Sequence, residues 1–122
     1  MDTPEKIRDA LAYATGTENY WSIYHGNRIL AITDGVKVMA DMCEAWWLLD
    51  KIYAEWASTP KLREEAFLVW RLTLDGTTAQ LIGDDGNGNE LFRQKISHTD
   101  FPLPEGIKLY LDNNVLMLPS EY

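Results

Sequence analysis

The sequence predicts an α+β fold: an antiparallel sheet, formed as a meander of hairpins, packed by one long helix and a short N-terminal helix. Apolar residues at helical spacing fill the first half of the chain, whereas β-rich runs separated by turn residues fill the second half. Strands and helices do not alternate, so a parallel, doubly wound sheet is excluded. The length, 122 residues, is that of a single globular domain spanning residues 1–122.

The first predicted element is a short helix over residues 4–14. Thr3 is a suitable N-cap, and Pro4 fits the first helical turn, where its missing N–H costs nothing. Gly16 is suited to end the helix. Two β-rich runs and the turn between them then predict a β-hairpin: 20–24, 28–32 and His25-Gly26-Asn27.

The longest predicted element is a helix from Val36 to Ala57, which Thr33-Asp34-Gly35 introduces as an N-cap. One side of this helix is apolar and carries Val38, Met42, Ala45, Leu49, Ile52, Tyr53 and Trp56. The opposite side carries Glu44, Lys51 and Glu55. Trp47 also falls on this polar side, which leaves three explanations open. The helix breaks near Asp41 to Cys43, another layer covers the indole, or the indole is exposed for a partner.

The second half of the chain predicts hairpins. Asp75-Gly76 and Asn113-Asn114 are residue pairs that favour type I′ turns, and the Gly- and Asn-rich segment from Gly83 to Asn89 predicts a looser turn. The strands that these turns separate are Ala66 to Leu74, Thr77 to Ile82, Glu90 to Ile96, Ile107 to Leu111 and Val115 to Leu118. One face of the resulting sheet is expected to be packed by helices and the other to be partly solvated.

Composition and charge restrict the class of partner. The chain has 11 Lys and Arg against 19 Asp and Glu, which gives a formal net charge of −8. This balance argues against direct binding to nucleic acid, because that binding depends on Lys and Arg releasing counterions from phosphates. No apolar run is long enough to span a bilayer, and the N-terminus does not resemble a secretory signal. We therefore expect a cytoplasmic protein without membrane contact.

The segment that most resembles a ligand-binding motif follows the second predicted strand of the meander. Asp85, Asn87 and Asn89 have the 1-3-5 spacing of a calcium loop. However, Glu90 stands where such a loop needs glycine, and Ile96 stands where it needs glutamate. The segment is therefore interpreted as a β-turn.

Other residue types with reactive or metal-binding side chains are few. The histidines are His25 and His98, and Cys43 is the single cysteine, which excludes an intrachain disulfide framework. No motif of a hydrolase, nucleotide-binding loop or metalloprotease is present. We therefore expect no metal and no cofactor, and Cys43 is interpreted as a small packed hydrophobic residue.

Aromatic residues are unusually frequent for so short a chain, with five Trp and six Tyr. Such residues dominate the energetics of protein interfaces, and they also line pockets for planar ligands or fill a Trp-rich core. Several of them cluster along the chain: Tyr20, Trp21, Tyr24, Trp46, Trp47, Tyr53 and Trp56.

Three ordered motifs resemble those of an uncharacterised family of short proteins carried by bacteria, phages and plasmids. They are a T-G-T-E turn before an aromatic pair, T-D-G-V before a helix, and W-W-L-L-D within one: Thr15–Trp21, Thr33–Ala40 and Ala45–Asp50. The resemblance extends to Phe101-Pro102-Leu103 and the closing strands. It implies no activity, because the family has none established. It does imply a mobile-element origin, where small acidic proteins are often inhibitors of host defence, such as anti-CRISPR proteins.

The first functional hypothesis is a non-enzymatic protein-interaction domain that inhibits a basic, nucleic-acid-binding protein. Its expected contact residues are Trp47, Glu44, Lys51 and Trp21, together with the acidic loop residues Asp84, Asp85 and Glu90. The alternative is a small-molecule-binding module whose pocket is framed by Thr17, Asp34 and Trp46, or an enzyme that uses Tyr20, His25, Asp34 and Asp50. The motif residues also have structural interpretations: Thr15-Gly16-Thr17 ends one helix, Thr33-Asp34-Gly35 starts another, and Asp50, next to Trp46 on the helical wheel, accepts an indole N–H. The sequence leaves the oligomeric state open.

Overall fold

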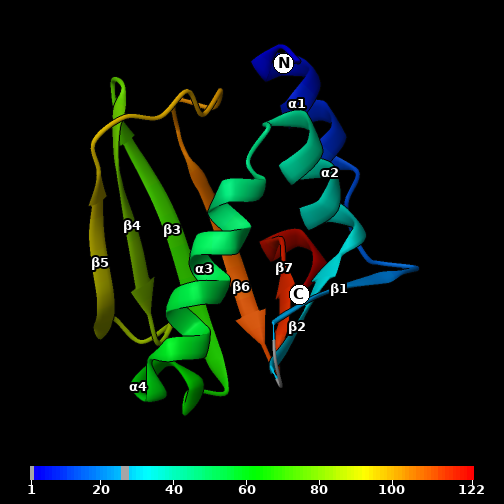
Figure 1. The fold of residues 1–122 in the computed structure, drawn as a ribbon. Helices are drawn as coiled ribbons and strands as arrows, with labels where there is room; N and C mark the ends of the chain where they lie inside the picture. The colour runs from blue at the N-terminus through cyan, green and yellow to red at the C-terminus, as the bar shows by residue number, and fades with distance from the viewer. Residues whose placement is uncertain (1, 26–27) are drawn as a thin grey trace.

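The computed structural model describes residues 2–25 and 28–122, with the side chains of residues 24, 25 and 28 left out. These residues form a seven-stranded sheet with strand order β1-β2-β7-β6-β3-β4-β5, packed by helices (Figure 1). The predicted α+β class is confirmed. The elements are α1 (Pro4–Ala12), β1 (Tyr20–His25), β2 (Arg28–Thr33), α2 (Asp34–Met42), α3 (Trp46–Ser58), α4 (Pro60–Arg63), β3 (Phe67–Asp75), β4 (Thr78–Asp84), β5 (Glu90–Ile96), β6 (Ile107–Asp112), β7 (Val115–Met117) and the 3-10 helix η1 (Pro119–Glu121).

The sheet is antiparallel except for one pair of strands. β1 and β2 form the predicted hairpin, although its turn residues Gly26 and Asn27 lie outside the described part of the chain. β3, β4 and β5 form the predicted meander, and β6 returns beside β3. The parallel pair is β2 with β7, which joins the N-terminal hairpin to the C-terminal one.

The single long helix that the sequence predicts is wrong in detail, because the structure has two helices, α2 and α3. The break falls at Cys43–Ala45, where Glu44 has φ 51° and so lies in the left-handed region. This turn rotates the second helix, so that Leu48, Leu49 and the residues that follow them at helical spacing face the core. The first of the three explanations for Trp47 is therefore correct. No described helix is long and apolar enough to cross a membrane.

Backbone angles confirm one predicted turn, at Asn113-Asn114, and correct another, at Asp75-Gly76. Asn113 and Asn114 have φ 48° and 67°, as a type I′ turn requires. The first turn of the meander is displaced by one residue, because Asp75 still pairs with Thr78 across the hairpin. Its central residues are Gly76 and Thr77, and only Gly76 has a positive φ, 63°. That pattern is typical of a type II′ turn, which suits Thr at the second position.

The core lies between the helices and one face of the sheet. β3 contributes Leu68, Trp70 and Leu72, which are buried against residues of α2 and α3 such as Met39 and Ile52. Figure 1 shows α3 crossing this face, while the opposite face of β3, β4 and β6 has no helix over it. The sheet is therefore packed on one side, as expected.

Candidate functional site

Exposed side chains from β1, α2 and α3 form a continuous chain of contacts. The Trp21 indole Nε1 donates to Asp34 Oδ1 at 3.1 Å, and the Lys37 ammonium lies over the Trp21 ring, 5.0 Å from its centroid. Lys37 Nζ also donates to Asp41 Oδ2 at 3.1 Å, and Trp46 Nε1 donates to Asp41 Oδ1 at 2.9 Å. Two indole rings are thus held in fixed orientations at the surface of the molecule.

Asp34, the first residue of α2, organises the turn that precedes β1. Its carboxylate Oδ2 accepts hydrogen bonds from the backbone N–H groups of Glu18 at 3.0 Å and Asn19 at 3.2 Å. Thr17 Oγ1 in turn accepts the Asp34 N–H at 2.9 Å and donates to the Asn19 carbonyl at 2.6 Å. The T-G-T-E and T-D-G-V segments therefore bind each other, and together they fix the start of the strand that carries Trp21.

Hydrogen bonding keeps both carboxylates of this chain of contacts charged. The Glu18 backbone amide and then the Trp21 indole hold the pKa of Asp34 below its ordinary value. The Trp46 indole and then the Lys37 ammonium lower the pKa of Asp41. Each indole N–H therefore faces an ionised acceptor at neutral pH, which is a stronger bond than one to a neutral group.

The two tryptophans at the start of α3 differ in exposure. Trp46 is 37% exposed, whereas Trp47 is half-buried and packs against the core. Trp47 borders a hollow of about 300 Å³ that Ile96 at the end of β5 and His98 also line. The second explanation for Trp47, cover by another layer, thus holds in part as well. The outward-facing indole of the helix is Trp46, which the sequence analysis had assigned to the alternative pocket.

Three charged residues accompany these indoles. Glu44 is exposed at the left-handed turn before α3, and Asp50 is exposed one helical turn after Trp46. Asp50 accepts no hydrogen bond from the described residues. Lys51 is half-buried and pairs with Glu55, Nζ to Oε1 3.7 Å. Of these three residues, Asp50 therefore offers an unpaired carboxylate beside the indoles. We call this surface the tryptophan face and define it as Trp21, Lys37, Asp41, Glu44, Trp46, Trp47 and Asp50.

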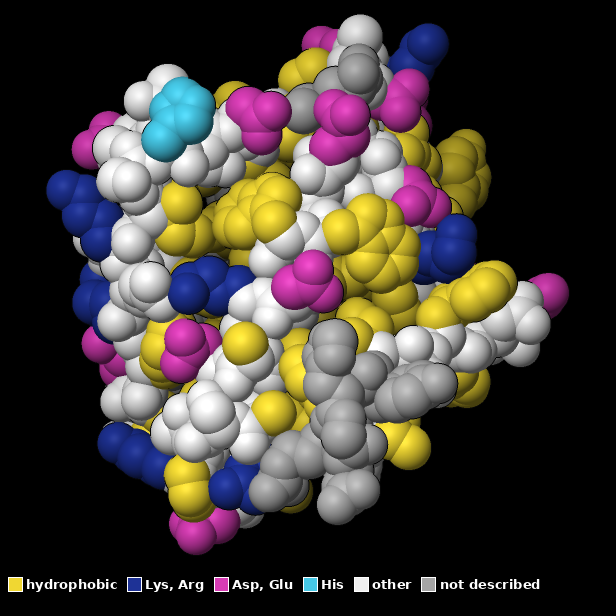
Figure 2. All heavy atoms as spheres, in the orientation of Figure 1, with side chains coloured by type: hydrophobic (Ala, Val, Ile, Leu, Met, Phe, Trp, Pro, Cys, Tyr) yellow, Lys and Arg dark blue, Asp and Glu magenta, His cyan; other side chains and the backbone are white. Residues whose placement is uncertain are grey.

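Figure 2 shows hydrophobic side chains gathered over the region where α2 and α3 meet, with acidic side chains around and between them. Trp21 is 43% exposed and Val38 39% exposed, so the apolar area extends from β1 to both helices. Exposed aromatic groups that are held in place are the kind of surface that anchors a protein interface, because little side-chain entropy is lost on binding.

The acidic loop of the predicted contact surface lies elsewhere. The β4–β5 turn is at the α4 end of the molecule, whereas the start of α3 is nearer the opposite end (Figure 1). Asp84 is buried, accepting from Arg71 Nε at 3.1 Å and from the Gly86 N–H at 2.7 Å. Glu90 pairs with Arg93, Nη2 to Oε1 2.6 Å. The predicted contact residues thus fall into two separate groups, and the exposed indole among them, Trp21, belongs to the tryptophan-face group.

The calcium-like segment is a turn held by its own side chains. Asp85 Oδ1 accepts the backbone N–H groups of Asn87 at 2.8 Å and Asn89 at 3.2 Å. Asp85 Oδ2 accepts from the Asn89 side-chain amide at 2.8 Å. These bonds, led by that of the Asn89 amide, lower the pKa of Asp85. No group of three or more His, Cys, Asp or Glu within residues 2–25 and 28–122 is placed to hold a metal ion.

Comparison with known proteins places the chain in a family. A family model described as a family of unknown function (DUF6876) matches residues 5–122. The chain belongs to DUF6876. The predicted membership of an uncharacterised family is thereby confirmed. No curated protein and no solved structure matches this member of DUF6876.

The residues named for other functions do not come together in this DUF6876 chain. Thr17 and Asp34 are bonded to each other, and Trp46 is bonded to Asp41. None of these three residues lines the cavities of about 580, 370 and 300 Å³ beside α1, β4 and Trp47. Of the alternative catalytic set, the His25 side chain lies outside the described residues. Cys43 is buried, and burial raises the pKa of its thiol to about 11, so the thiolate needed for nucleophilic attack is scarce at neutral pH.

Proposed function

We propose that this protein is a non-enzymatic interaction domain, encoded by a mobile element, that inhibits a basic nucleic-acid-binding protein of the host cytoplasm. In this proposal it acts as anti-CRISPR proteins do, by occupying a surface that the partner uses for nucleic acid. The tryptophan face is the docking surface. Its indoles supply apolar contact area, and the exposed carboxylate of Asp50 meets cationic groups that otherwise bind phosphates.

The observation that carries this proposal is the chain of contacts from Trp21 through Lys37 and Asp41 to Trp46. Contiguous exposed apolar surface marks interaction sites, and here both exposed indole rings are fixed in advance by charged acceptors. The net charge of −8 adds long-range attraction to a basic partner and speeds the encounter. The small-molecule alternative has no such support, because the residues expected to frame its pocket are hydrogen-bonded instead. Thr17 is bonded to Asp34, and Trp46 is bonded to Asp41.

Affinity capture from host lysate at low and at high salt tests the proposal. The tagged proteins are wild type, Trp21→Ala, Trp46→Ala and, as a matched control, Tyr13→Ala, because Tyr13 is an aromatic residue that is 86% exposed at the C-terminal end of α1 and is not part of the tryptophan face. We expect wild type and the control to retain the same basic nucleic-acid-binding protein at low salt. Each tryptophan variant should retain about a tenth or less of it, as for a residue that dominates an interface.

The captured protein is then purified and tested for binding to its nucleic acid. Wild type should compete with the nucleic acid, and Trp46→Ala should compete poorly. Equal capture by the tryptophan variants, or a captured partner whose nucleic-acid binding is unaffected, would contradict the proposal. Circular dichroism of each variant establishes that the loss is not a loss of fold.

A further inference from the structure

Strand β6 has an edge that its neighbours cover only in part. On one side it pairs with β3 along its whole length, Ile107–Asp112. On the other side β7 pairs only with its second half, Tyr110–Asp112. β7 is three residues long and stops where Pro119 begins η1. Residues 107–109 therefore keep one edge of backbone groups that no described strand covers.

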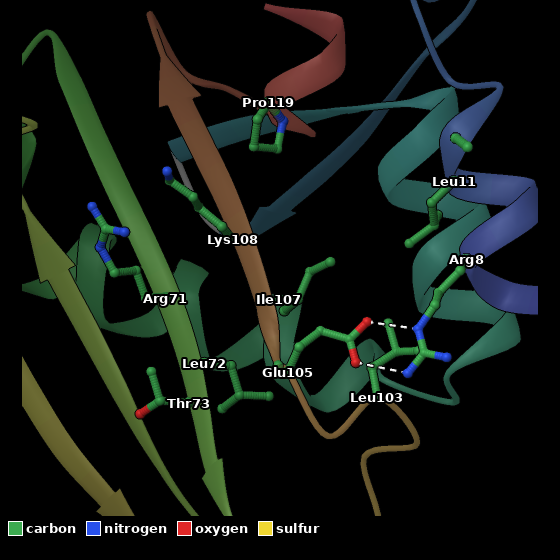
Figure 3. Close-up of a pocket in the computed structure, with 12 residues that line it drawn as sticks. Arg8, Leu11, Arg71, Leu72, Thr73, Leu103, Glu105, Ile107, Lys108 and Pro119 are labelled. Carbon is green, nitrogen blue, oxygen red and sulfur yellow. Dashed lines mark hydrogen bonds and ion pairs between the residues drawn. The ribbon is translucent and has the colours of Figure 1, made fainter. Parts of the chain in front are cut away.

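A cavity of about 580 Å³ lies at the start of β6, where residues of α1, β3 and β6 line it. In the close-up of Figure 3, Leu11 of α1 and Ile107 of β6 point into it from opposite sides, and Pro119 closes one end. The volume lies within the range of roughly 300–1,000 Å³ that is common for ligand sites. The site thus places an apolar space near the backbone N–H and C=O groups of residues 107–109, the part of β6 that β7 leaves unpaired.

The charges around the cavity oppose the charge of the molecule. Arg8, Arg71, Lys108 and Glu105 line it, three cations against one anion in a chain whose net charge is −8. Arg8 is paired with Glu105, Nε to Oε2 2.8 Å and Nη2 to Oε1 2.9 Å, and Arg71 is paired with Asp84, Nε to Oδ2 3.1 Å. Lys108 makes no ion pair with any described residue, and its ammonium lies over the Tyr110 ring, 5.7 Å from the centroid. Lys108 is therefore available to a carboxylate.

We propose that this edge binds an extended peptide segment of a partner protein as a short additional strand, with alternating apolar and acidic side chains. Successive side chains of a strand point to opposite faces. The apolar ones enter the space between Leu11 and Ile107, and the acidic ones meet Lys108. The backbone of the segment pairs with residues 107–109, which is the mode of recognition known as β-strand addition.

The uncovered edge of β6 and the unpaired Lys108 favour an acidic peptide strand over other ligands. Three residues of a strand span about 10 Å, so the paired part of the segment is short. Nucleic acid is disfavoured, because one unpaired lysine neutralises too little phosphate charge. The proposal does not depend on the tryptophan face, which lies on other residues and attracts basic rather than acidic groups.

Peptide titration followed by NMR tests the proposal on the full chain labelled with ¹⁵N. The probe is the amide-capped peptide acetyl-LELEL-amide, whose carboxylates are all on side chains. We expect the backbone amide signals of residues 107–109 to shift with a Kd of about 1 mM or tighter, while acetyl-LKLKL-amide binds at least about tenfold more weakly. Lys108→Glu should weaken LELEL binding by about the same factor, and the matched control Lys61→Glu should not.

Two N-methylated versions of the probe test strand pairing directly. One is methylated at the leucine nitrogens and the other at the glutamate nitrogens. Because alternate N–H groups of a strand face its neighbour, one version should lose binding and the other should keep it.

Equal binding by both methylated versions would overturn the proposal, as would unshifted signals of residues 107–109 or full binding by Lys108→Glu. Sodium octanoate is titrated as well. If it shifts these signals while the peptide does not, the cavity is a site for a small amphiphilic carboxylate, and the peptide proposal fails.

Discussion

At the scale of single residues, two aspartates determine how the tryptophan face is presented. Asp34 and Asp41 each accept an indole N–H, and each also binds a second group, the turn before β1 or the Lys37 ammonium. Sequence reasoning anticipated that aspartates accept indole N–H groups, but it paired Trp46 with Asp50. The true acceptor is Asp41, because the left-handed turn at Glu44 brings the end of α2 beside the start of α3.

Removing one indole N–H at a time should change the pKa of one aspartate at a time. Trp21→Phe should raise the pKa of Asp34 toward its ordinary value and leave that of Asp41 unchanged, and Trp46→Phe should do the reverse. Titration of the side-chain carboxyl carbons by NMR measures both values. A pKa of Asp41 that is the same in Trp46→Phe as in wild type would show that the Trp46 bond is not made in solution, because the Lys37 ammonium accounts for only part of the lowering.

These shifts also set the direction of a pH effect on stability. The pKa of each aspartate is lower in the folded state than in the unfolded state. The stabilisation is therefore complete above the unfolded value, about 4, and is lost as the pH falls through the folded value. The tryptophan variants should accordingly lose less stability on acidification than wild type does.

At the scale of elements, turn chemistry made the strands predictable. Asn113 and Asn114 tolerate the left-handed conformation, so the last hairpin was placed correctly. The helix break was not predictable from local preference, because Glu44 is a good helix former. The break arises from packing, since α2 and α3 each bury an apolar side against the sheet and one straight helix cannot do both. The short β7 that leaves the edge of β6 uncovered follows from Pro119.

The start of β6 depends on a glycine in a way that a substitution can measure. Gly106 has φ +76°, and a Cβ there would collide with the Leu72 carbonyl oxygen of β3. Gly106→Ala should destabilise the fold by at least about 3 kcal/mol, because a backbone clash adds to the cost of the left-handed conformation.

Gly88→Ala is the matched control for that substitution. Gly88 also has a positive φ, +89°, but no atom lies within 4 Å of the added Cβ. Only the conformational cost remains, about 1 kcal/mol. Urea denaturation of both variants measures the difference, and equal losses of stability would contradict the packing described at Gly106.

At the scale of the whole molecule, the residues predicted to form one contact surface lie near two ends of the molecule. Helical periodicity and loop composition do not give the distance between two elements in the folded chain, so this separation could not be predicted from them. Asp84 is buried and paired, and Glu90 is paired with a neighbouring arginine, so the acidic loop is largely neutralised. The tryptophan face keeps the exposed rings of Trp21 and Trp46 together with the exposed carboxylate of Asp50. Its exposed helix indole, Trp46, could have been found only by knowing where the helix breaks.

The most direct test of this account is an NMR titration of the five tryptophan indole N–H signals with a deca-arginine peptide, a probe for a basic protein surface. The account predicts that the indole signals of Trp21 and Trp46 shift most and that those of the buried Trp56 and Trp70 stay in place. Added salt should reverse the shifts. Larger shifts at the β4–β5 turn, with the Trp21 and Trp46 indoles unmoved, would contradict the assignment of the tryptophan face as the docking surface.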